Sequence, residues 1–146
     1  MKLALDAMGG DNAPSINIDG AKLALEKIST LEKLYLVGDE ATLKQACDAA
    51  GIGSNPRVEI VHAEEVVTME ESGLVAVRQK KKSSMSISVD LVKNGTCDAV
   101  LSAGNTGAAV AASTTHLPSM QFTSLGHCKL QSWKIWLSYC VCYYCC

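Results

Sequence analysis

Apolar residues form short runs that alternate with longer stretches in which apolar and polar residues are mixed. Four of the short runs have the length and composition of buried strands: residues 2–6, 34–37, 57–61 and 98–102. The mixed stretches between them predict helices. Strands alternating with helices are typical of parallel βαβ units, so we expect an α/β fold with a doubly wound, Rossmann-like parallel sheet.

Several residues mark where the predicted helices begin and end. Pro14 suits a first helical turn, because its missing N–H is not needed there. Apolar residues then recur every three or four positions over 18–28. Asp39 is expected to cap the next helix and Gly51 to end it. A later helix is expected within 83–95, capped by its two leading serines and ended by its glycine.

The loop after the first strand contains Gly9 and Gly10 between Asp6 and Asp11. Glycines let a backbone approach a ligand without interference from a Cβ. Ligands of doubly wound sheets bind beyond the carboxyl ends of the strands, so a substrate-binding loop is one interpretation. A tight turn with a helix cap is the other. The spacing does not fit the dinucleotide-binding glycine pattern.

The loop after the fourth strand reads Ser-Ala-Gly-Asn-Thr-Gly-Ala over residues 102–108 and precedes an alanine-rich helix. Bare backbone N–H groups at a helix N-terminus favour an anion such as phosphate. Ser102, Asn105 and Thr106 add side-chain donors. The structural interpretation is a cap at Asn105 or Thr106, with Gly107 allowing close packing. The phosphate loop of nucleotide triphosphatases is excluded, because its Lys-Ser/Thr ending is missing.

Other candidate groups are weaker. The basic run 78–82 is best interpreted as a solvated face, although Arg78 or Lys81 could reach an anionic ligand. His62 follows the third strand and is either a general base or a hydrogen-bonded loop residue. No Ser-His-Asp or Cys-His set is evident. Cys97 has no basic neighbour in sequence that would lower its pKa.

Composition divides the 146-residue chain near Ser113. The whole chain has 13 basic and 15 acidic side chains, which argues against nucleic-acid binding. Asp98 is the last acidic residue, whereas five of the seven cysteines and most aromatic residues come after position 120. No apolar run approaches the roughly 20 residues of a membrane helix, and Asp6 interrupts any signal-peptide core. A cytoplasmic protein is expected.

The order of these motifs resembles the bacterial phosphate acyltransferase (PlsX) family. The resemblance begins with Asp-Ala-Met-Gly-Gly-Asp at 6–11 and continues through Leu-Val-Gly-Asp at 36–39 and Ser-Ser-Met at 83–85. It ends with the 102–108 motif and covers about 112 residues. Members of the family transfer an acyl group from acyl carrier protein to inorganic phosphate. The resemblance implies these two partners, no cofactor, no metal and no nucleic acid.

The resemblance also implies roles for the loop residues. Asn105, Thr106 and Asp6 are expected in the catalytic region. Residues expected to bind phosphate or to form the facing loop are Gly9, Gly10, Asp11, Arg78, Lys81, Ser102, Gly104 and Gly107. Phosphate itself is the nucleophile in this chemistry, so positioning and fixed donors are the main catalytic contributions.

The C-terminal segment departs from the family pattern. We expect residues 1–113 to form the N-terminal part of the acyltransferase, with a partial sheet, and 114–146 to be an unrelated tail, such as a frameshift product. The family's homodimer contacts and its peripheral attachment to the inner face of the membrane belong to regions missing here. An inactive chain is therefore expected. The alternative is a non-catalytic fragment that binds anions or nucleotides. A metal site in the cysteines of 140–146 lacks paired zinc spacing.

Overall fold

Four parallel strands form the single sheet of the described part of the protein. The structure is a computed structural model that describes residues 1–116. The strands are β1 (Lys2–Asp6), β2 (Lys33–Gly38), β3 (Val58–His62) and β4 (Ala99–Ser102), in the spatial order β3-β2-β1-β4. The predicted α/β fold with a parallel sheet is therefore confirmed. Strands β1 and β4 are neighbours in the sheet although residues 7–98 separate them in the chain.

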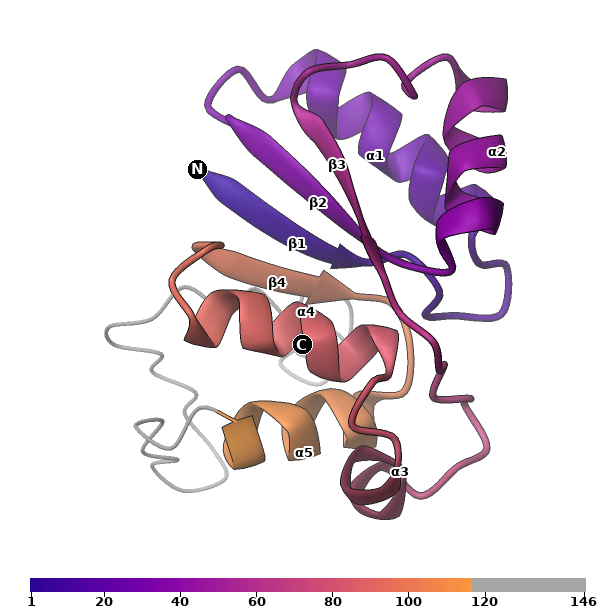
Figure 1. Cartoon of the computed structure of the whole chain (residues 1–146), viewed down its shortest axis with the longest axis vertical. Helices are drawn as coiled ribbons and strands as arrows, with labels where there is room; N and C mark the ends of the chain where they lie inside the picture. Colours follow the sequence, from indigo (N-terminus) through magenta and orange to yellow (C-terminus); the bar gives the residue numbers. More distant parts are fainter. Residues whose placement is uncertain (117–146) are drawn as a thin grey trace, which may run out of the picture.

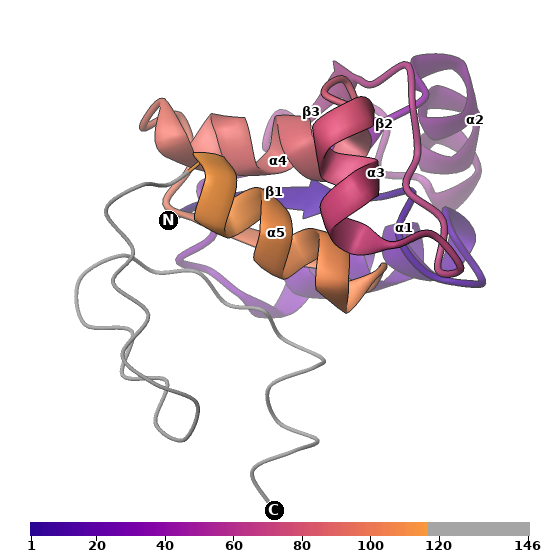
Figure 2. The ribbon, with the colours of Figure 1, turned by 90° about the horizontal axis from the view of Figure 1, so that it is seen from below.

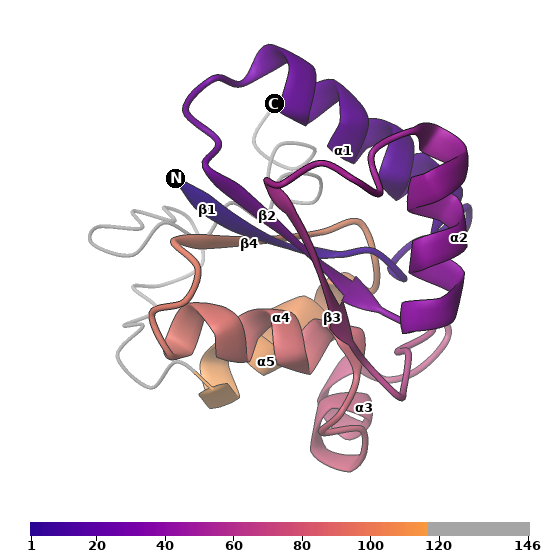
Figure 3. The same ribbon diagram turned by 45° about the horizontal axis from the view of Figure 1, so that its top comes forward.

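Helices cover both faces of the sheet (Figures 1 and 3). The first face carries α1 (Ser15–Lys27) and α2 (Glu40–Ala50), which contact each other. The other face carries α3 (Gly73–Gln79), α4 (Ser84–Lys93) and α5 (Thr106–His116), grouped together in Figure 2. The sequence pattern did not predict α3 as a separate helix. Its seven residues make only about two turns, which is too short for apolar residues to recur at i, i+3, i+4 and i+7.

Alternation along the strands supplies a core on each side of the sheet. Leu5 and Leu36 pack with Ile18 and Leu25 of α1 on the first face. Ala4 and Val100 face the opposite way and pack with α4 and α5. Because successive side chains of a strand point to opposite faces, a five-residue strand such as β1 serves both cores.

The predicted helix boundaries follow local capping chemistry. Asp39 caps α2 by accepting a hydrogen bond from the Thr42 N–H at 2.8 Å, and Gly51 ends it with a φ of 75°. Ser83 caps α4 by accepting from the Ser86 N–H at 3.3 Å. Pro14 lies one position before the first residue of α1 and occupies its N-cap. The capping predictions for α2 and α4 are confirmed.

The predicted division near Ser113 falls inside α5. This helix continues to His116, and Ser113 is buried. The remaining features of the tail, including its cysteines, lie outside the described residues. Within 1–116, no helix is both long enough and apolar enough to cross a bilayer.

Candidate functional site

The two glycine-containing loops meet at the carboxyl ends of β1 and β4. Asp6 at the end of β1 is in register with Ser102 at the end of β4. A Cβ on Gly9 would lie 2.8 Å from the Gly104 nitrogen, so the backbones are too close for any side chain between them. Gly10 has a φ of 99°, and a Cβ there would lie 3.2 Å from the Ala103 carbonyl oxygen. The two loops therefore share one edge of the sheet, as expected for loops that follow neighbouring parallel strands.

A buried carboxylate lies beneath this contact. Asp6 is 2% exposed and accepts a hydrogen bond from the Ser102 hydroxyl at 2.8 Å. The Ser102 hydroxyl in turn accepts from the Gly104 N–H at 3.0 Å, and Asp6 also accepts from the Met8 N–H at 3.3 Å. Burial raises the pKa of Asp6 above its usual value, against the lowering effect of hydrogen bonds from Ser84 and Ser102. Asp6 therefore links the ends of both loops.

Asn17 of α1 holds the first loop from its other side. Its side-chain amide nitrogen donates to the carbonyl oxygens of Ala7 and Gly9, both at 2.9 Å, and the residue is buried. Sequence reasoning missed Asn17, because an asparagine inside a helix looks like an ordinary polar position. The sequence contains one local sign of this role: Asn17 is a polar residue next to the apolar Ile18, on the buried side of the helix.

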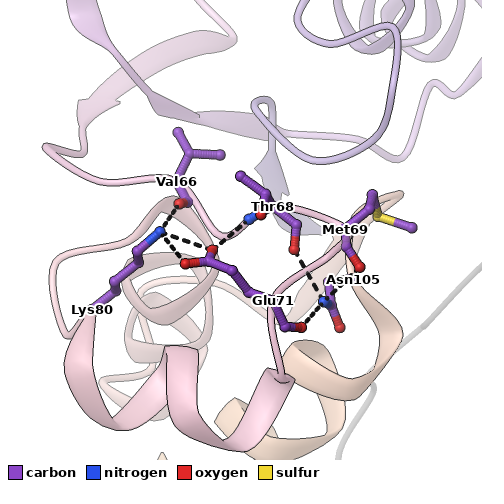
Figure 4. A network of polar contacts seen from close by, with 6 residues as sticks. All are labelled: Val66, Thr68, Met69, Glu71, Lys80 and Asn105. Carbon is purple, nitrogen blue, oxygen red and sulfur yellow. Dashed lines mark hydrogen bonds and ion pairs between the residues drawn. The ribbon is translucent and has the colours of Figure 1, made fainter.

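Asn105 connects the second loop to a third one. Its side-chain oxygen accepts from the Ala108 N–H at 3.0 Å and so caps the start of α5. Its amide nitrogen lies within hydrogen-bonding distance of three carbonyl oxygens, those of Thr68 at 3.0 Å, Met69 at 3.3 Å and Glu71 at 2.7 Å (Figure 4). The structural interpretation of Asn105 as a cap is confirmed. A role in catalysis stays a prediction.

A lysine and a glutamate fix this third loop, residues 66–71. The Lys80 ammonium lies 2.7 Å from a carboxylate oxygen of Glu71 and donates to the Val66 carbonyl at 2.8 Å (Figure 4). Glu71 also accepts from the Thr68 N–H at 2.8 Å. The hydrogen bond from Lys80 lowers the pKa of Glu71 below its usual value. Sequence reasoning did not identify this loop, because its partners are distant in the chain.

Two openings border the glycine loops. A cavity of about 420 Å³ lies between the first loop and the third, with Met8, Asp11 and Met69 among its lining residues. A cleft of about 630 Å³ lies on the α1 side of the sheet and ends at Gly9, Ser102 and Asp11. Gly10 and Asp11 line both openings. A ligand in either one would therefore contact the first glycine loop.

The remaining predicted site residues are more exposed. Thr106 and Gly107 lie exposed in the first turn of α5. The N-terminus of α3 packs against this turn, since a Cβ on Gly73 would overlap the Gly107 backbone. Arg78 and Lys81 are exposed, and neither lines either opening. Within the basic run, Lys80 is paired with Glu71 next to the loops, and Lys82 is paired with Glu64 at 3.0 Å.

Side chains capable of nucleophilic or metal chemistry lie elsewhere. Cys47 and Cys97 are buried, and burial raises the pKa of both thiols, that of Cys97 to about 11. His62 is exposed, and its Nδ1 accepts from the Glu40 N–H at 3.4 Å. Within residues 1–116, no group of three or more His, Cys, Asp or Glu side chains is arranged to hold a metal ion.

Comparison with known proteins gives a consistent set of relatives. Residues 1–124 match the family described as "Fatty acid synthesis protein". A phosphate acyltransferase of Akkermansia muciniphila is 68% identical over 117 residues, which are 80% of this chain and 33% of that protein. A phosphate acyltransferase of Streptococcus mutans is 46% identical over 111 residues, 76% of this chain and 32% of that protein. The chain thus spans about a third of the length of these relatives.

Proposed function

Because the chain belongs to the fatty acid synthesis protein family, we propose that it provides the phosphate-binding part of an acyltransferase. The reaction is transfer of an acyl group from acyl carrier protein to inorganic phosphate. The observation that carries this proposal is the meeting of the 6–11 and 102–107 loops at one edge of the sheet, beside the N-terminus of α5. Ligands of doubly wound sheets bind at that edge.

The proposed reaction needs a bound anion more than it needs an activated side chain. A phosphate oxygen attacks the thioester carbonyl carbon, the new C–O bond forms and the C–S bond breaks. The sulfur leaves on acyl carrier protein and takes up a proton as a thiol, and the product is acyl phosphate. The protein must place the two reactants together and stabilise the oxyanion. The high thiol pKa values of Cys47 and Cys97 agree with a mechanism that does not use them.

We assign the phosphate to the first turn of α5. A helix N-terminus carries a partial positive charge of roughly half an elementary unit. Thr106 and Gly107 are exposed in this turn, and the Ala108 N–H donates to the Asn105 side chain. The loop with Gly9, Gly10 and Asp11 then faces the acyl group. Asp6 and Ser102 position the two loops, and the exposed Arg78 and Lys81 contribute long-range attraction for anions.

A chimaeric protein tests the proposal directly. Residues 1–116 would be joined to the part of the Akkermansia muciniphila relative that follows its matched segment. With acyl carrier protein thioester and phosphate, we expect acyl phosphate, trapped with hydroxylamine, at a rate similar to that of the relative. The Thr106→Val variant should lower turnover about 10-fold or more, because one oxyanion donor is typically worth at least that much. Thr115→Val, near the other end of α5, is the matched control.

The alternative function has a separate readout. If the folded chimaera forms no acyl phosphate while nucleotides raise its melting temperature, the loops belong to a nucleotide-binding module and the proposal is wrong. Homodimer formation and peripheral attachment to the cytoplasmic face of the membrane are part of the same proposal. They would be checked on the chimaera by sedimentation and by binding to lipid vesicles.

A further inference from the structure

Large apolar side chains are concentrated on the exposed side of α3 and in the loop before it. Within residues 1–116, eight large apolar residues are exposed, and three of them lie within seven positions: Met69, Leu74 and Val75. Exposed apolar residues scattered singly are normal, whereas a group of them indicates an interaction site. The other side of α3 is formed by the buried Ala76 and Val77. The helix therefore has one side in the core and one apolar side in solvent.

Unpaired positive charge lies beside these apolar residues. Arg78 comes four residues after Leu74 and three after Val75, so the three side chains share the exposed side of the helix. Lys81 follows shortly after the helix ends. Among the described residues, the lysines on either side of Lys81 are paired with glutamates, whereas Arg78 and Lys81 are exposed and form no ion pair. These four residues form a surface that we name the α3 face.

The α3 face lies next to the candidate site but outside its two openings. Helix α3 packs against α5 (Figure 2), and a Cβ on Gly73 would overlap the Gly107 backbone, in the turn to which we assign the phosphate. Leu74 is the next residue along the chain. Met69 and Glu70, just before the helix, line the smaller opening, whereas no residue of the α3 face lines either opening. A partner bound to the α3 face is therefore beside the site and not inside it.

The chemistry of the α3 face limits the kind of partner. A guanidinium and an ammonium group beside an exposed leucine and valine match a surface on which carboxylates surround an apolar side chain. A protein can present both kinds of group together. In the proposed reaction a protein delivers the thioester, and the body of that protein must stay outside while the thioester enters. The α3 face has the position and the charge for this contact.

We propose that the α3 face is the docking surface for the protein part of the thioester substrate, the acyl carrier protein. The proposal rests on the proposed function. Leu74 and Val75 supply the apolar centre of the contact, and Arg78 and Lys81 bind carboxylates of the carrier protein around it. Charged groups at the rim of such a contact mainly affect the rate and salt dependence of association, so the apolar pair should determine most of the affinity.

Direct binding is the first test. Fluorescently labelled acyl carrier protein of Akkermansia muciniphila would be titrated with the full 146-residue chain, purified as a monodisperse species, and the anisotropy measured. Leu74→Asp should weaken binding at least about 10-fold, because it removes an apolar contact and repels the carboxylates of the partner. Leu23→Asp is the matched control, since Leu23 on α1 is also 51% exposed, and it should leave the affinity unchanged. Equal affinities of the two variants would overturn the proposal.

The charged residues of the α3 face have a test of their own. Binding should weaken as salt is added, and Arg78→Ala should weaken it about 3-fold at low salt and reduce this salt dependence. Lys93→Ala removes the same charge from an exposed position in the last turn of α4 and should change neither quantity. A salt dependence that both variants reduce equally would indicate attraction to net charge and no docking surface.

The chimaera gives a kinetic test. Leu74→Asp should raise the KM for the acyl carrier protein thioester at least about 10-fold, but the KM for acyl pantetheine, which lacks the carrier protein, by less than about 2-fold. Leu23→Asp should change neither KM. An equal increase for both thioesters upon Leu74→Asp would assign the α3 face to the acyl site or to the fold, and the proposal would be wrong.

Two further measurements identify other occupants of the α3 face. Leu74→Asp should leave the melting temperature of the chimaera unchanged within about 2 °C, because Leu74 is exposed. A fall of about 5 °C or more would show that the rest of the protein covers this surface, which would overturn the proposal. Binding to phosphatidylglycerol vesicles that Leu74→Asp abolishes, with carrier-protein binding unaffected, would assign the surface to a membrane instead.

Failure of this proposal is distinguishable from failure of the proposed function. Carrier-protein binding that depends on Leu74, without acyl phosphate formation by the chimaera, would support the docking surface and reject the reaction. An active chimaera whose KM for the carrier-protein thioester does not depend on Leu74 would support the reaction and reject the docking surface.

Discussion

Asp6 is a buried residue whose carboxyl group connects the two glycine-containing loops through hydrogen bonds. Its oxygens accept from the Ser102 hydroxyl at the end of β4 and from the Met8 N–H in the loop after β1. Burial of a charged group is costly, and the raised pKa reports that cost. We infer that the loop geometry is maintained at some expense in stability at neutral pH.

The raised pKa of Asp6 predicts a specific pH dependence of stability. A carboxyl group whose pKa is higher in the folded protein than in the unfolded chain binds its proton more tightly when folded. Its contribution to the free energy of unfolding is therefore greatest below the unfolded value near 3.8 and falls as pH rises through the folded pKa. Urea unfolding should show the difference between wild type and Asp6→Asn decreasing from about pH 3 to pH 7.

Glu71 provides the control for this experiment. Its pKa is lowered by Lys80, so its contribution is present above the unfolded pKa and is lost as pH falls through the folded one. The difference between wild type and Glu71→Gln should therefore increase with pH. Parallel slopes for the two variants would contradict the assignment of burial as the dominant effect at Asp6.

Asn105 shows how one side chain can serve the fold and still lie at a candidate site. Asn105→Ala removes the cap of α5 and the donor to the 66–71 loop, and we expect a loss of about 2 kcal/mol in the free energy of unfolding. If Asn105 also acts on substrate, turnover of the chimaera falls much further than this destabilisation explains. Turnover measured well below the melting temperature separates the two effects, and full retention of activity there would leave Asn105 with the structural role alone.

At the scale of elements, the site depends on backbones that approach closely. Gly9→Ala would place a Cβ 2.8 Å from the Gly104 nitrogen and from an Asp6 carboxylate oxygen. The backbone of the second loop would have to shift, so we expect a destabilisation of about 2 kcal/mol, measured by urea unfolding. Gly20→Ala is the matched control. Its Cβ meets nothing, and alanine favours a helix over glycine by up to about 1 kcal/mol. Equal stability of the two variants would show that the loops tolerate separation.

The elements also show which parts of the structure a sequence can predict. The four strands and the caps at Asp39 and Ser83 were predictable, because hydrophobic alternation and capping act over a few residues. The shared edge of the two glycine loops followed from parallel strand topology. The role of Asn17 was not predictable, since its two partners are backbone carbonyls whose position depends on the folded loop.

In the basic run 78–82, by contrast, the sequence did not predict which cation lies near the loops. Arg78 and Lys81 were selected for their charge, but position within the fold decides which cation is held, and Lys80 is the one next to Glu71 and Val66. Arg78 lies in the last turn of α3, Lys80 is the C-cap residue and Lys81 follows the helix. The place where the helix ends therefore determines which of these cations lies next to the 66–71 loop. Charge alone contains no information on where the helix ends.

At the scale of the whole molecule, the described residues form one side of the candidate site. The glycine loops and the first turn of α5 are preorganised by buried hydrogen bonds. The two openings next to them face solvent, and the apolar cleft is uncovered on the α1 side. Acyl transfer to phosphate requires that water be kept from the thioester, because hydrolysis would compete with the phosphate nucleophile.

We therefore expect the 146-residue chain by itself to form little or no acyl phosphate. The described residues could bind phosphate, but they leave the acyl group in water. They therefore cannot hold the phosphate and the thioester together, and this reaction depends on that positioning. The cysteine- and aromatic-rich sequence after position 120 should also promote aggregation, and solubility should improve when the chain is cut. The cut belongs after His116 and not at Ser113, because Ser113 is buried within α5. The measurement is the hydroxylamine-trapped product formed by the intact chain and by residues 1–116, each purified as a monodisperse species. Turnover near that of the Akkermansia muciniphila relative from either one would show that one side of the site is sufficient for catalysis.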